Sequence, residues 1–226
     1  MSVQHPSLEQ QRESLRKNRY LVVRNYLPAV LTETAYRYVL MKMQNGEFSL
    51  ADTQVPNTPA FYGDTLTDTL LESAVPFVER MVDELLYPTY SYMRMYKRGD
   101  QLAPHNDRPS CEVSMTLCLG YDVSGSGDPD FCWPICVDNS IDYSSDSDKA
   151  GRPAALGEGK SVCLKPGDGV IYYGTEVRHW RNPFPGERHA QVFFHFVRRK
   201  GPYAESKFDY RPMLGASHTT REPPQE

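Results

Sequence analysis

The chain has 226 residues, a formal net charge of −4 and a pI near 5.9. This length suits one domain with a sizeable core, and the acidic balance gives no general attraction to phosphate backbones, so we expect no nucleic-acid partner. No apolar run approaches the length that spans a membrane, and the polar stretch 1–18 lacks the apolar core of a signal peptide. We therefore expect no membrane association and a cytoplasmic location.

The first 88 residues carry mainly helical patterns. The predicted elements are a helix over 7–18, a strand over 20–26, a helix over 31–43, a loop over 51–63 and a helix over 65–86. Ser7 is the expected N-cap of the first helix, where Gln10 completes a capping box. Pro76 is expected to kink the last helix or to split it in two. We expect residues 1–88 to form a helical support region packed on the core.

From residue 89 onward the hydrophobic pattern changes to a period of two, which is typical of half-buried strands. Six strands are predicted, over residues 90–96, 112–119, 131–137, 161–165, 170–173 and 188–197. Several short strands separated by Gly-, Asp- and Pro-rich turns predict a mainly β domain of the α+β class, whose core over 89–200 is a double-stranded β-helix, or jelly roll. The first part of the polar tail 201–226 is expected to pack on the core, and its end is expected to fray.

The cysteines number five and lie mostly in apolar, strand-like runs; they are Cys111, Cys118, Cys132, Cys136 and Cys163. Their odd count and the lack of a compact cysteine framework predict reduced thiols, which agrees with a cytoplasmic location.

The segment 138–159 is rich in Asp, Ser and Gly and is expected to be a mobile surface loop. A loop of this length can also be a lid over a site. A calcium loop is a third interpretation, but the segment lacks the Gly and the terminal Glu of a helix-loop-helix calcium site.

A candidate metal site is carried by His105 and Asp107, which lie two residues apart and therefore point to the same side of an extended backbone. A third ligand must come from elsewhere, and His179 is the best candidate. Its rivals are His189 and His195, which we expect to point away from the barrel interior, and His218 in the tail. Two histidines and one carboxylate on one side of an ion form the ligand set of non-haem Fe(II) oxygenases.

Arg188 follows His179 by nine residues and opens the apolar run 189–197. Strand alternation places it on the same face as Ala190 and Val192, which we take to be the interior face. An arginine at the mouth of an apolar face is costly unless it meets an anion. We therefore predict that Arg188 binds a carboxylate of a dicarboxylate co-substrate through paired hydrogen bonds.

The ordered set of His105, Asp107, His179 and Arg188 resembles the 2-oxoglutarate- and Fe(II)-dependent dioxygenases, in particular the prolyl 4-hydroxylase-like branch. The approach from Tyr96 to His105 and the sequence Lys-Pro-Gly-Asp at 165–168 match that branch as well. The resemblance covers roughly residues 90–198 as short motifs.

This resemblance implies that His105, Asp107 and His179 bind Fe(II), that 2-oxoglutarate is the co-substrate, and that ascorbate is a candidate reductant. It implies that Arg188 binds the far carboxylate of 2-oxoglutarate, with Tyr96 as a further hydroxyl; a core aromatic is the alternative for Tyr96. Halogenating relatives carry a small residue at the position of Asp107, so the carboxylate favours hydroxylation.

The implied function is a hydroxylase of a small-molecule substrate such as an amino acid. The chain has Asp-Phe-Cys-Trp-Pro-Ile at 130–135 where prolyl hydroxylases carry Gly-Gly-Glu-Thr, and Phe194 where nucleic-acid demethylases carry a second arginine. Two alternatives stay open: a peptide or protein hydroxylase of the prolyl type, and a catalytically silent jelly-roll binding module. Four residues flank the candidate ligands: Arg108, Arg178, Trp180 and Arg181. One interpretation is that they contact the substrate, with Arg181 at a substrate carboxylate. The other is that they are ordinary surface residues.

Overall fold

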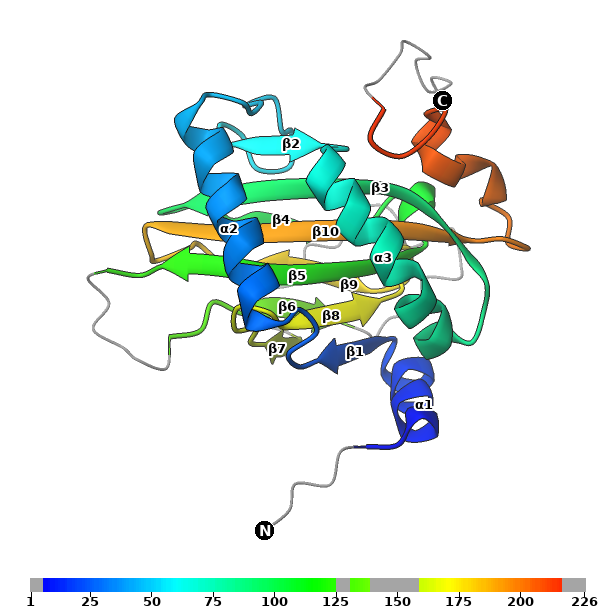
Figure 1. Cartoon of the computed structure of the whole chain (residues 1–226). Helices are drawn as coiled ribbons and strands as arrows, with labels where there is room; N and C mark the ends of the chain where they lie inside the picture. Colours follow the sequence, from blue (N-terminus) through cyan, green and yellow to red (C-terminus); the bar gives the residue numbers. More distant parts are fainter. Residues whose placement is uncertain (1–5, 125–130, 139–158, 217–226) are drawn as a thin grey trace.

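Two antiparallel β-sheets form the centre of the molecule (Figure 1). The computed structural model describes residues 6–124, 131–138 and 159–216. The larger sheet has the order β1-β8-β5-β10-β3-β2 and the smaller one the order β4-β9-β6-β7. Antiparallel strands in two facing sheets are consistent with the predicted jelly-roll core.

The bounds of the strands differ from the predicted ones mainly where a strand is short. The strands are β1 (Tyr20–Val23), β2 (Ala60–Tyr62), β3 (Leu86–Lys97), β4 (Leu102–His105), β5 (Val113–Asp122), β6 (Ile135–Asp138), β7 (Lys160–Val162), β8 (Gly169–Tyr172), β9 (Arg178–Arg181) and β10 (Arg188–Arg198). Three of them, β2, β4 and β9, have no counterpart among the predicted strands.

Three helices precede the long strands: α1 (Leu8–Asn18), α2 (Ala29–Gln44) and α3 (Thr65–Val82). The predicted capping box is present, since the Ser7 side chain accepts from the Gln10 backbone and the Gln10 side chain accepts from the Ser7 backbone. The expected split of the last helix is wrong, because α3 runs through Pro76 as one element. It ends at Val82, and its C-cap Asp83 adopts a left-handed conformation with φ 62°.

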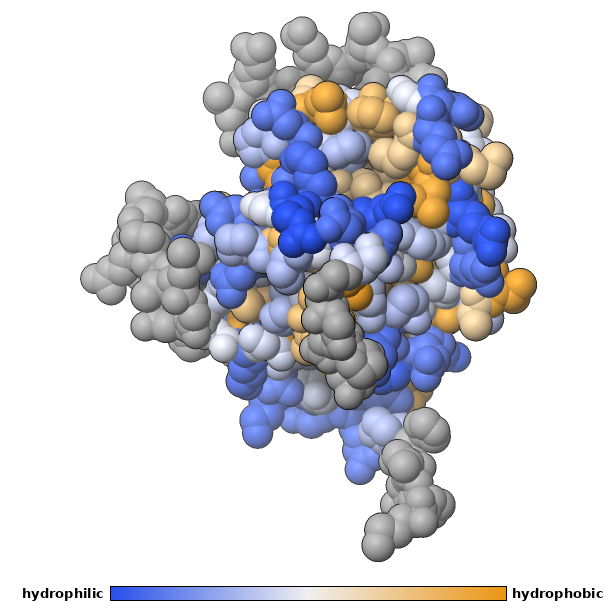
Figure 2. Space-filling view, turned by 90° about the vertical axis from the view of Figure 1, so that its left-hand side faces the viewer, coloured by the Kyte–Doolittle hydropathy of each residue, from blue (hydrophilic) through white to orange (hydrophobic). Residues whose placement is uncertain are grey.

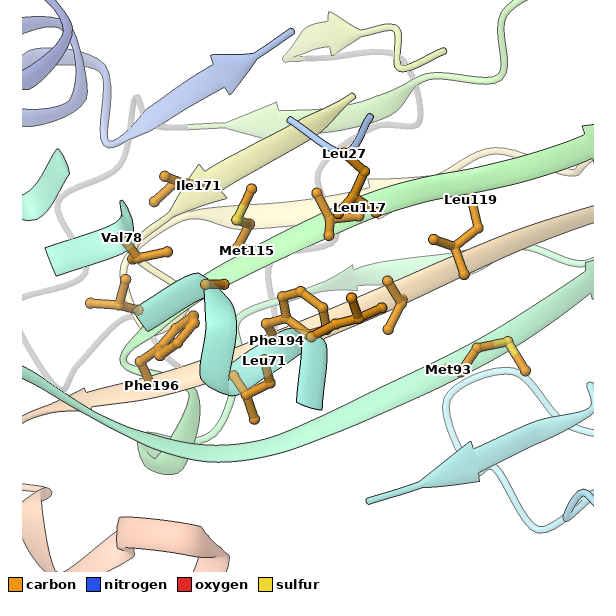
Figure 3. Close-up of a cluster of buried hydrophobic side chains, with 14 of the residues drawn as sticks. Leu27, Leu71, Val78, Met93, Met115, Leu117, Leu119, Ile171, Phe194 and Phe196 are labelled. Carbon is orange, nitrogen blue, oxygen red and sulfur yellow. The ribbon is translucent and has the colours of Figure 1, made fainter. Parts of the chain in front are cut away.

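The main hydrophobic core lies between α2, α3 and the larger sheet. Figure 3 shows its side chains between α3 and the sheet. Leu71 and Val78 of α3 meet Met115 of β5 and Phe194 of β10, and all four side chains are fully buried. Burial of side chains of this size stabilises the fold by roughly 1.5–3 kcal/mol each relative to exposure. The helices therefore hold the outer face of the larger sheet and leave its inner face to the smaller sheet.

Strand β10 is buried on both faces, and the two faces differ in chemistry. Ala190, Val192, Phe194 and Phe196 belong to the main core under the helices. The alternate residues His189, Gln191, Phe193 and His195 therefore face the space between the two sheets. The interior face of β10 is thus the polar one, which is the opposite of our prediction.

Region 1–88 supplies β1 and β2 to the two edges of the larger sheet as well as its helices. At the other end of the chain, the 3-10 segment Ala204–Tyr210 packs against β3, and its Asp209 pairs with Arg108 at 2.8 Å. The next residue but one, Arg211, is buried and pairs with Asp68 of α3 at 2.8 Å. The tail is therefore held to the core as far as the described residues extend.

The prediction of five reduced cysteines is wrong, because Cys132 and Cys163 form a disulfide with their Cα atoms 5.6 Å apart. Cys111, Cys118 and Cys136 are free and buried. The cytoplasmic location stays a prediction, and the cysteines no longer support it.

Most of the predicted loop 138–159 lies outside the described residues, since these exclude 139–158. The interpretations of this loop as a lid or as a calcium loop therefore stay predictions. Among the helices described, none combines the length and the apolar character needed to cross a membrane.

Candidate metal centre

The two predicted histidine ligands lie side by side because two short strands pair. β4 runs antiparallel to β9, and the register places His105 directly opposite His179. Side chains of directly opposed residues lie on the same face of a sheet. The two imidazole rings therefore meet, with centroids 4.3 Å apart, at the inner face of the smaller sheet.

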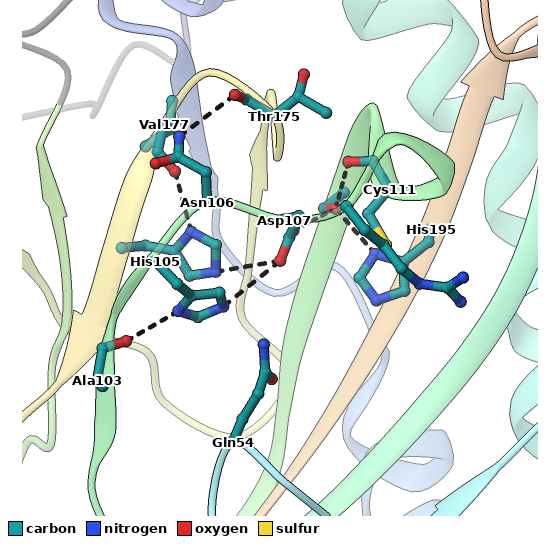
Figure 4. Close-up of polar contacts among 12 residues, drawn as sticks. Gln54, Ala103, His105, Asn106, Asp107, Cys111, Thr175, Val177 and His195 are labelled. Carbon is teal, nitrogen blue, oxygen red and sulfur yellow. Dashed lines mark hydrogen bonds and ion pairs between the residues drawn. The ribbon is translucent and has the colours of Figure 1, made fainter. Parts of the chain in front are cut away.

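Both histidines are held in the tautomer that a metal ligand needs (Figure 4). The Nδ1 of His105 is 2.9 Å from the carbonyl oxygen of Ala103, and the Nδ1 of His179 is 3.0 Å from the carbonyl oxygen of Val177. A carbonyl only accepts, so each Nδ1 carries the proton and donates it. Each Nε2 is consequently left with a free lone pair.

Asp107 completes the cluster. Its Oδ1 lies 3.6 Å from the Nε2 of His105 and 3.6 Å from the Nε2 of His179. Its Oδ2 accepts a hydrogen bond of 3.1 Å from the hydroxyl of Ser114, and its backbone N–H donates to the carbonyl of Gly174. The carboxylate is thus fixed so that one oxygen faces the two histidines and the other faces Ser114.

Electrostatics favour the protonation states that bind a cation. Burial lowers the pKa of His179 to about 4, and the neighbouring His105 adds to this effect, so His179 is neutral at pH 7. Burial by itself raises the pKa of Asp107, but His179, His105 and His195 offset this and hold it well below its ordinary value. Asp107 is therefore a carboxylate at neutral pH.

The three donors also leave one side of the cluster open. The side chains of His105 and Asp107 are 20% and 11% exposed, whereas that of His179 is 3% exposed. Figure 4 shows the side-chain amide of Gln54, an exposed residue between α2 and β2, directed toward the cluster.

The donor set fits Fe(II). Two imidazole nitrogens and one carboxylate oxygen all lie within 4.8 Å of one another. This is the two-histidine, one-carboxylate arrangement that non-haem iron oxygenases use. The structure therefore brings together His105, Asp107 and His179, as the sequence pattern predicted.

Tyr96 and Arg188 behave differently from each other. Tyr96 is fully buried on the inner face of β3, and its hydroxyl oxygen accepts a hydrogen bond of 2.9 Å from Arg94. Arg188 is half exposed and pairs with Asp122 at 3.0 Å. It is the first residue of β10. Figure 2 shows the molecule from the side on which β10 begins, and the described surface there is largely hydrophilic. The predicted interior placement of Arg188 is wrong.

Three functional candidates on the inner faces were missed or undervalued. His195 and His189 were expected to point outward, yet both are buried toward the interior, and the Nδ1 of His195 contacts the Ser114 hydroxyl at 2.9 Å. Arg181 was open to interpretation as surface charge, yet it is only 2% exposed. A signal was present in the sequence, since the polar residues of this otherwise apolar run, His189, Gln191 and His195, all fall on the same alternating set of positions.

A two-sheet core in which two histidines and one carboxylate converge is the arrangement that the resemblance to the 2-oxoglutarate- and Fe(II)-dependent dioxygenases predicted. Comparison with solved structures shows that the chain has this fold, as the resemblance predicted. The sequence itself matches no protein-family model and no curated protein.

Among these structures is a prolyl 4-hydroxylase from Pseudomonas putida, with a TM-score of 0.60 and 18% identity over 86% of this chain and 100% of that one. A prolyl hydroxylase from Trichoplax adhaerens, in complex with a hypoxia-inducible-factor peptide, has a TM-score of 0.60 and 15% identity, over 84% of this chain and 88% of that one. The α-ketoglutarate-dependent epimerase SnoN from nogalamycin biosynthesis has a TM-score of 0.68 and 15% identity, over 93% of this chain and 91% of that one. At such low sequence identities, the similarity to these structures shows the fold alone.

Proposed function

We propose that this chain is an Fe(II)- and 2-oxoglutarate-dependent dioxygenase that hydroxylates a small organic molecule, with release of succinate and CO₂. One observation carries the proposal: the free Nε2 atoms of His105 and His179 and the Oδ1 of Asp107 converge on one point, and every other polar atom of these side chains is directed elsewhere. A chance group of polar side chains has no reason to fix both tautomers in this way.

The residues of the chain contribute position and protection. His105, Asp107 and His179 would hold the iron, and the open side leaves room for a co-substrate and dioxygen. Bound Fe(II) and 2-oxoglutarate would activate dioxygen, which is the oxidant, because the oxidative decarboxylation of 2-oxoglutarate to succinate and CO₂ takes up one oxygen atom and leaves the other for the substrate. The carboxylate of Asp107 keeps its place in the cluster occupied, which favours hydroxylation over halogen transfer. The buried aromatic interior limits access of water to the reacting groups.

A small-molecule substrate is the first choice, and a peptide is the second. The epimerase SnoN, one of the structural neighbours, has been solved with Fe³⁺, α-ketoglutarate and nogalamycin RO. The Trichoplax hydroxylase has been solved with a peptide fragment. The absence of a Gly-Gly-Glu-Thr stretch at 130–135 favours the small molecule. A cytoplasmic location is proposed from the sequence alone.

The decisive experiment is an anaerobic titration of the metal-free protein with Fe(II) and then with 2-oxoglutarate, followed by the visible charge-transfer absorption. We expect a band with the wild type and none with His179→Ala. Zn(II) in place of Fe(II) is the control, because its filled d shell gives no such band. Absence of the band in the wild type would refute the proposal and favour a silent binding module.

A further inference from the structure

Arg181 is a buried cation with an unsatisfied donor. It is the last residue of β9, lies two positions after His179 and is 2% exposed. Its Nη1 donates to the carbonyl of Trp133 at 2.8 Å, and its guanidinium lies over the Trp133 ring at 4.5 Å from the centroid. Its Nη2 is buried and has no hydrogen-bond partner among the described residues.

The other buried arginines of the described chain show what Arg181 lacks. Arg94 pairs with Asp52 at 2.6 Å, and Arg211 pairs with Asp68 at 2.8 Å. No ion pair joins Arg181 to a carboxylate among the residues the structure describes. Burial lowers the pKa of Arg181, yet a guanidinium keeps its proton in proteins. An uncompensated buried charge is strongly destabilising, so an anion is the missing partner.

Neighbouring groups add donors at the same place. His189 is buried with both ring nitrogens unpartnered, and its ring packs against Trp133 at 5.1 Å. The Tyr96 ring packs edge-on against Trp133 at 4.8 Å. Because the Tyr96 oxygen accepts from Arg94, its own hydrogen remains available for an acceptor. Arg181, His189 and Tyr96 thus all offer N–H or O–H donors around Trp133, which is the chemistry that a carboxylate requires.

The position relative to the metal cluster also fits. Residues two apart on a strand share a face, so Arg181 faces the interior as His179 does. Leu102 lies directly opposite Arg181 in the register and belongs to the inner apolar cluster with Tyr96 and Trp133. Two strand residues span about 6.6 Å. That is the scale of a five-carbon dicarboxylate with one end at the metal.

We propose that Arg181, assisted by Tyr96 and His189, binds the distal carboxylate of 2-oxoglutarate, and that Arg188 has no part in this contact. This inference rests on the proposed function. It departs from the expected motif, because the cation comes from the smaller sheet, two residues after the second histidine ligand. Arg188, nine residues after it, is already paired with Asp122 at the surface.

The test compares two 2-oxo acids of equal chain length, 2-oxoglutarate and 2-oxovalerate, which lacks the distal carboxylate. Dissociation constants are measured by calorimetry on the Mn(II)-loaded full chain, for the wild type, Arg181→Met, Arg181→Lys and Arg188→Met. Removal of a buried charged donor predicts that Arg181→Met weakens 2-oxoglutarate binding about 100-fold. Its binding of 2-oxovalerate stays within about threefold of wild type. The affinity of Arg181→Lys for 2-oxoglutarate lies between those of the wild type and Arg181→Met, and the affinity of Arg188→Met equals that of the wild type.

The outcomes separate this inference from the proposed function. If the wild type prefers 2-oxoglutarate but Arg188→Met rather than Arg181→Met abolishes the preference, the assignment of Arg181 is overturned and the function stands. If the wild type binds neither 2-oxo acid, both fall. Circular dichroism and thermal melting establish that each variant is folded.

Should Arg181→Met fail to fold, Tyr96→Phe provides the second test, since it keeps the packing and removes one donor. We expect it to weaken 2-oxoglutarate binding about tenfold and to leave 2-oxovalerate binding unchanged. An unchanged preference in Tyr96→Phe would then overturn the inference.

Discussion

Ser114 is the residue whose replacement tests most directly how the chain prepares Asp107 for a metal. Its hydroxyl lies 3.1 Å from the Oδ2 of Asp107 and 2.9 Å from the Nδ1 of His195. The carbonyl oxygen of Cys111 also lies 3.2 Å from this hydroxyl. The hydroxyl has one hydrogen, and the ionised carboxylate of Asp107 is a stronger acceptor than the carbonyl, so the hydrogen goes to Asp107 and His195 donates to the hydroxyl oxygen. The resulting chain of hydrogen bonds holds Oδ2 and turns Oδ1 toward the two histidine ligands.

Replacement of Ser114 by Ala breaks this chain and leaves two buried polar atoms without a partner. We expect a loss of about 1–3 kcal/mol in the free energy of unfolding from the unpaired groups. Because Asp107 is then free to rotate, we also expect metal affinity to fall about 10- to 100-fold, as is usual when a residue that orients a metal ligand is removed. The second effect is the informative one, since a merely structural role produces only the first.

The assay is equilibrium binding of Mn(II) to the metal-free protein, with stability measured by urea unfolding. Thr116→Val is the matched control, because Thr116 is also a buried residue two positions along the same face of β5 and its hydroxyl donates to the carbonyl of Val192. It should lose stability but keep metal affinity. Equal metal affinity in Ser114→Ala, Thr116→Val and wild type would refute the reasoning.

Three further predictions follow from the same geometry. Gly174→Ala should weaken Mn(II) binding at least tenfold, because the added Cβ would lie 2.5 Å from the Oδ2 of Asp107; wild-type affinity would contradict this. The metal-free protein should lose stability as the pH falls from about 6.5 to about 4. Burial lowers the pKa values of His179 and His195 to about 4, so below pH 6.5 the unfolded chain takes up protons that the folded chain does not. The loss should be on the order of 3 kcal/mol per histidine, and urea midpoints that do not change with pH would exclude it. Arg211→Met should cost about 3 kcal/mol in urea unfolding because it leaves a buried carboxylate without its cation, and a cost below about 1 kcal/mol would show that the pair is unimportant.

The first two members of the candidate metal cluster were predictable because their information is local, whereas the distant His179 was selected through the family resemblance. His105 and Asp107 lie two apart in the sequence, and residue types with metal-binding chemistry are few. The helices were predictable for a similar reason, since capping and periodicity act within a few residues. The strands β4 and β9 were not. Each has only four residues, and each is stabilised by its partner in the other part of the chain rather than by its own sequence.

The error over Arg188 has a physical cause that concerns strands buried on both faces. Alternation correctly separated the residues of β10 into two sets, but hydrophobicity does not say which set faces the site. The more apolar set lies under the helices, where only packing matters. The less apolar set, with His189 and His195, faces the space between the sheets, where ligands must be bound.

This reversal suggests how such sequences are better interpreted. An enzyme of two facing sheets needs polar groups inside, and every buried polar group needs a partner or a ligand. Arg94 finds Asp52, His195 finds Ser114, and Arg181 finds no carboxylate among the described residues. Among the unsatisfied groups of the described interior, the buried cation without an anion is therefore the one that points to an anionic ligand. For this chain it indicates a carboxylate held beside Trp133, on the same face of β9 as the second histidine ligand.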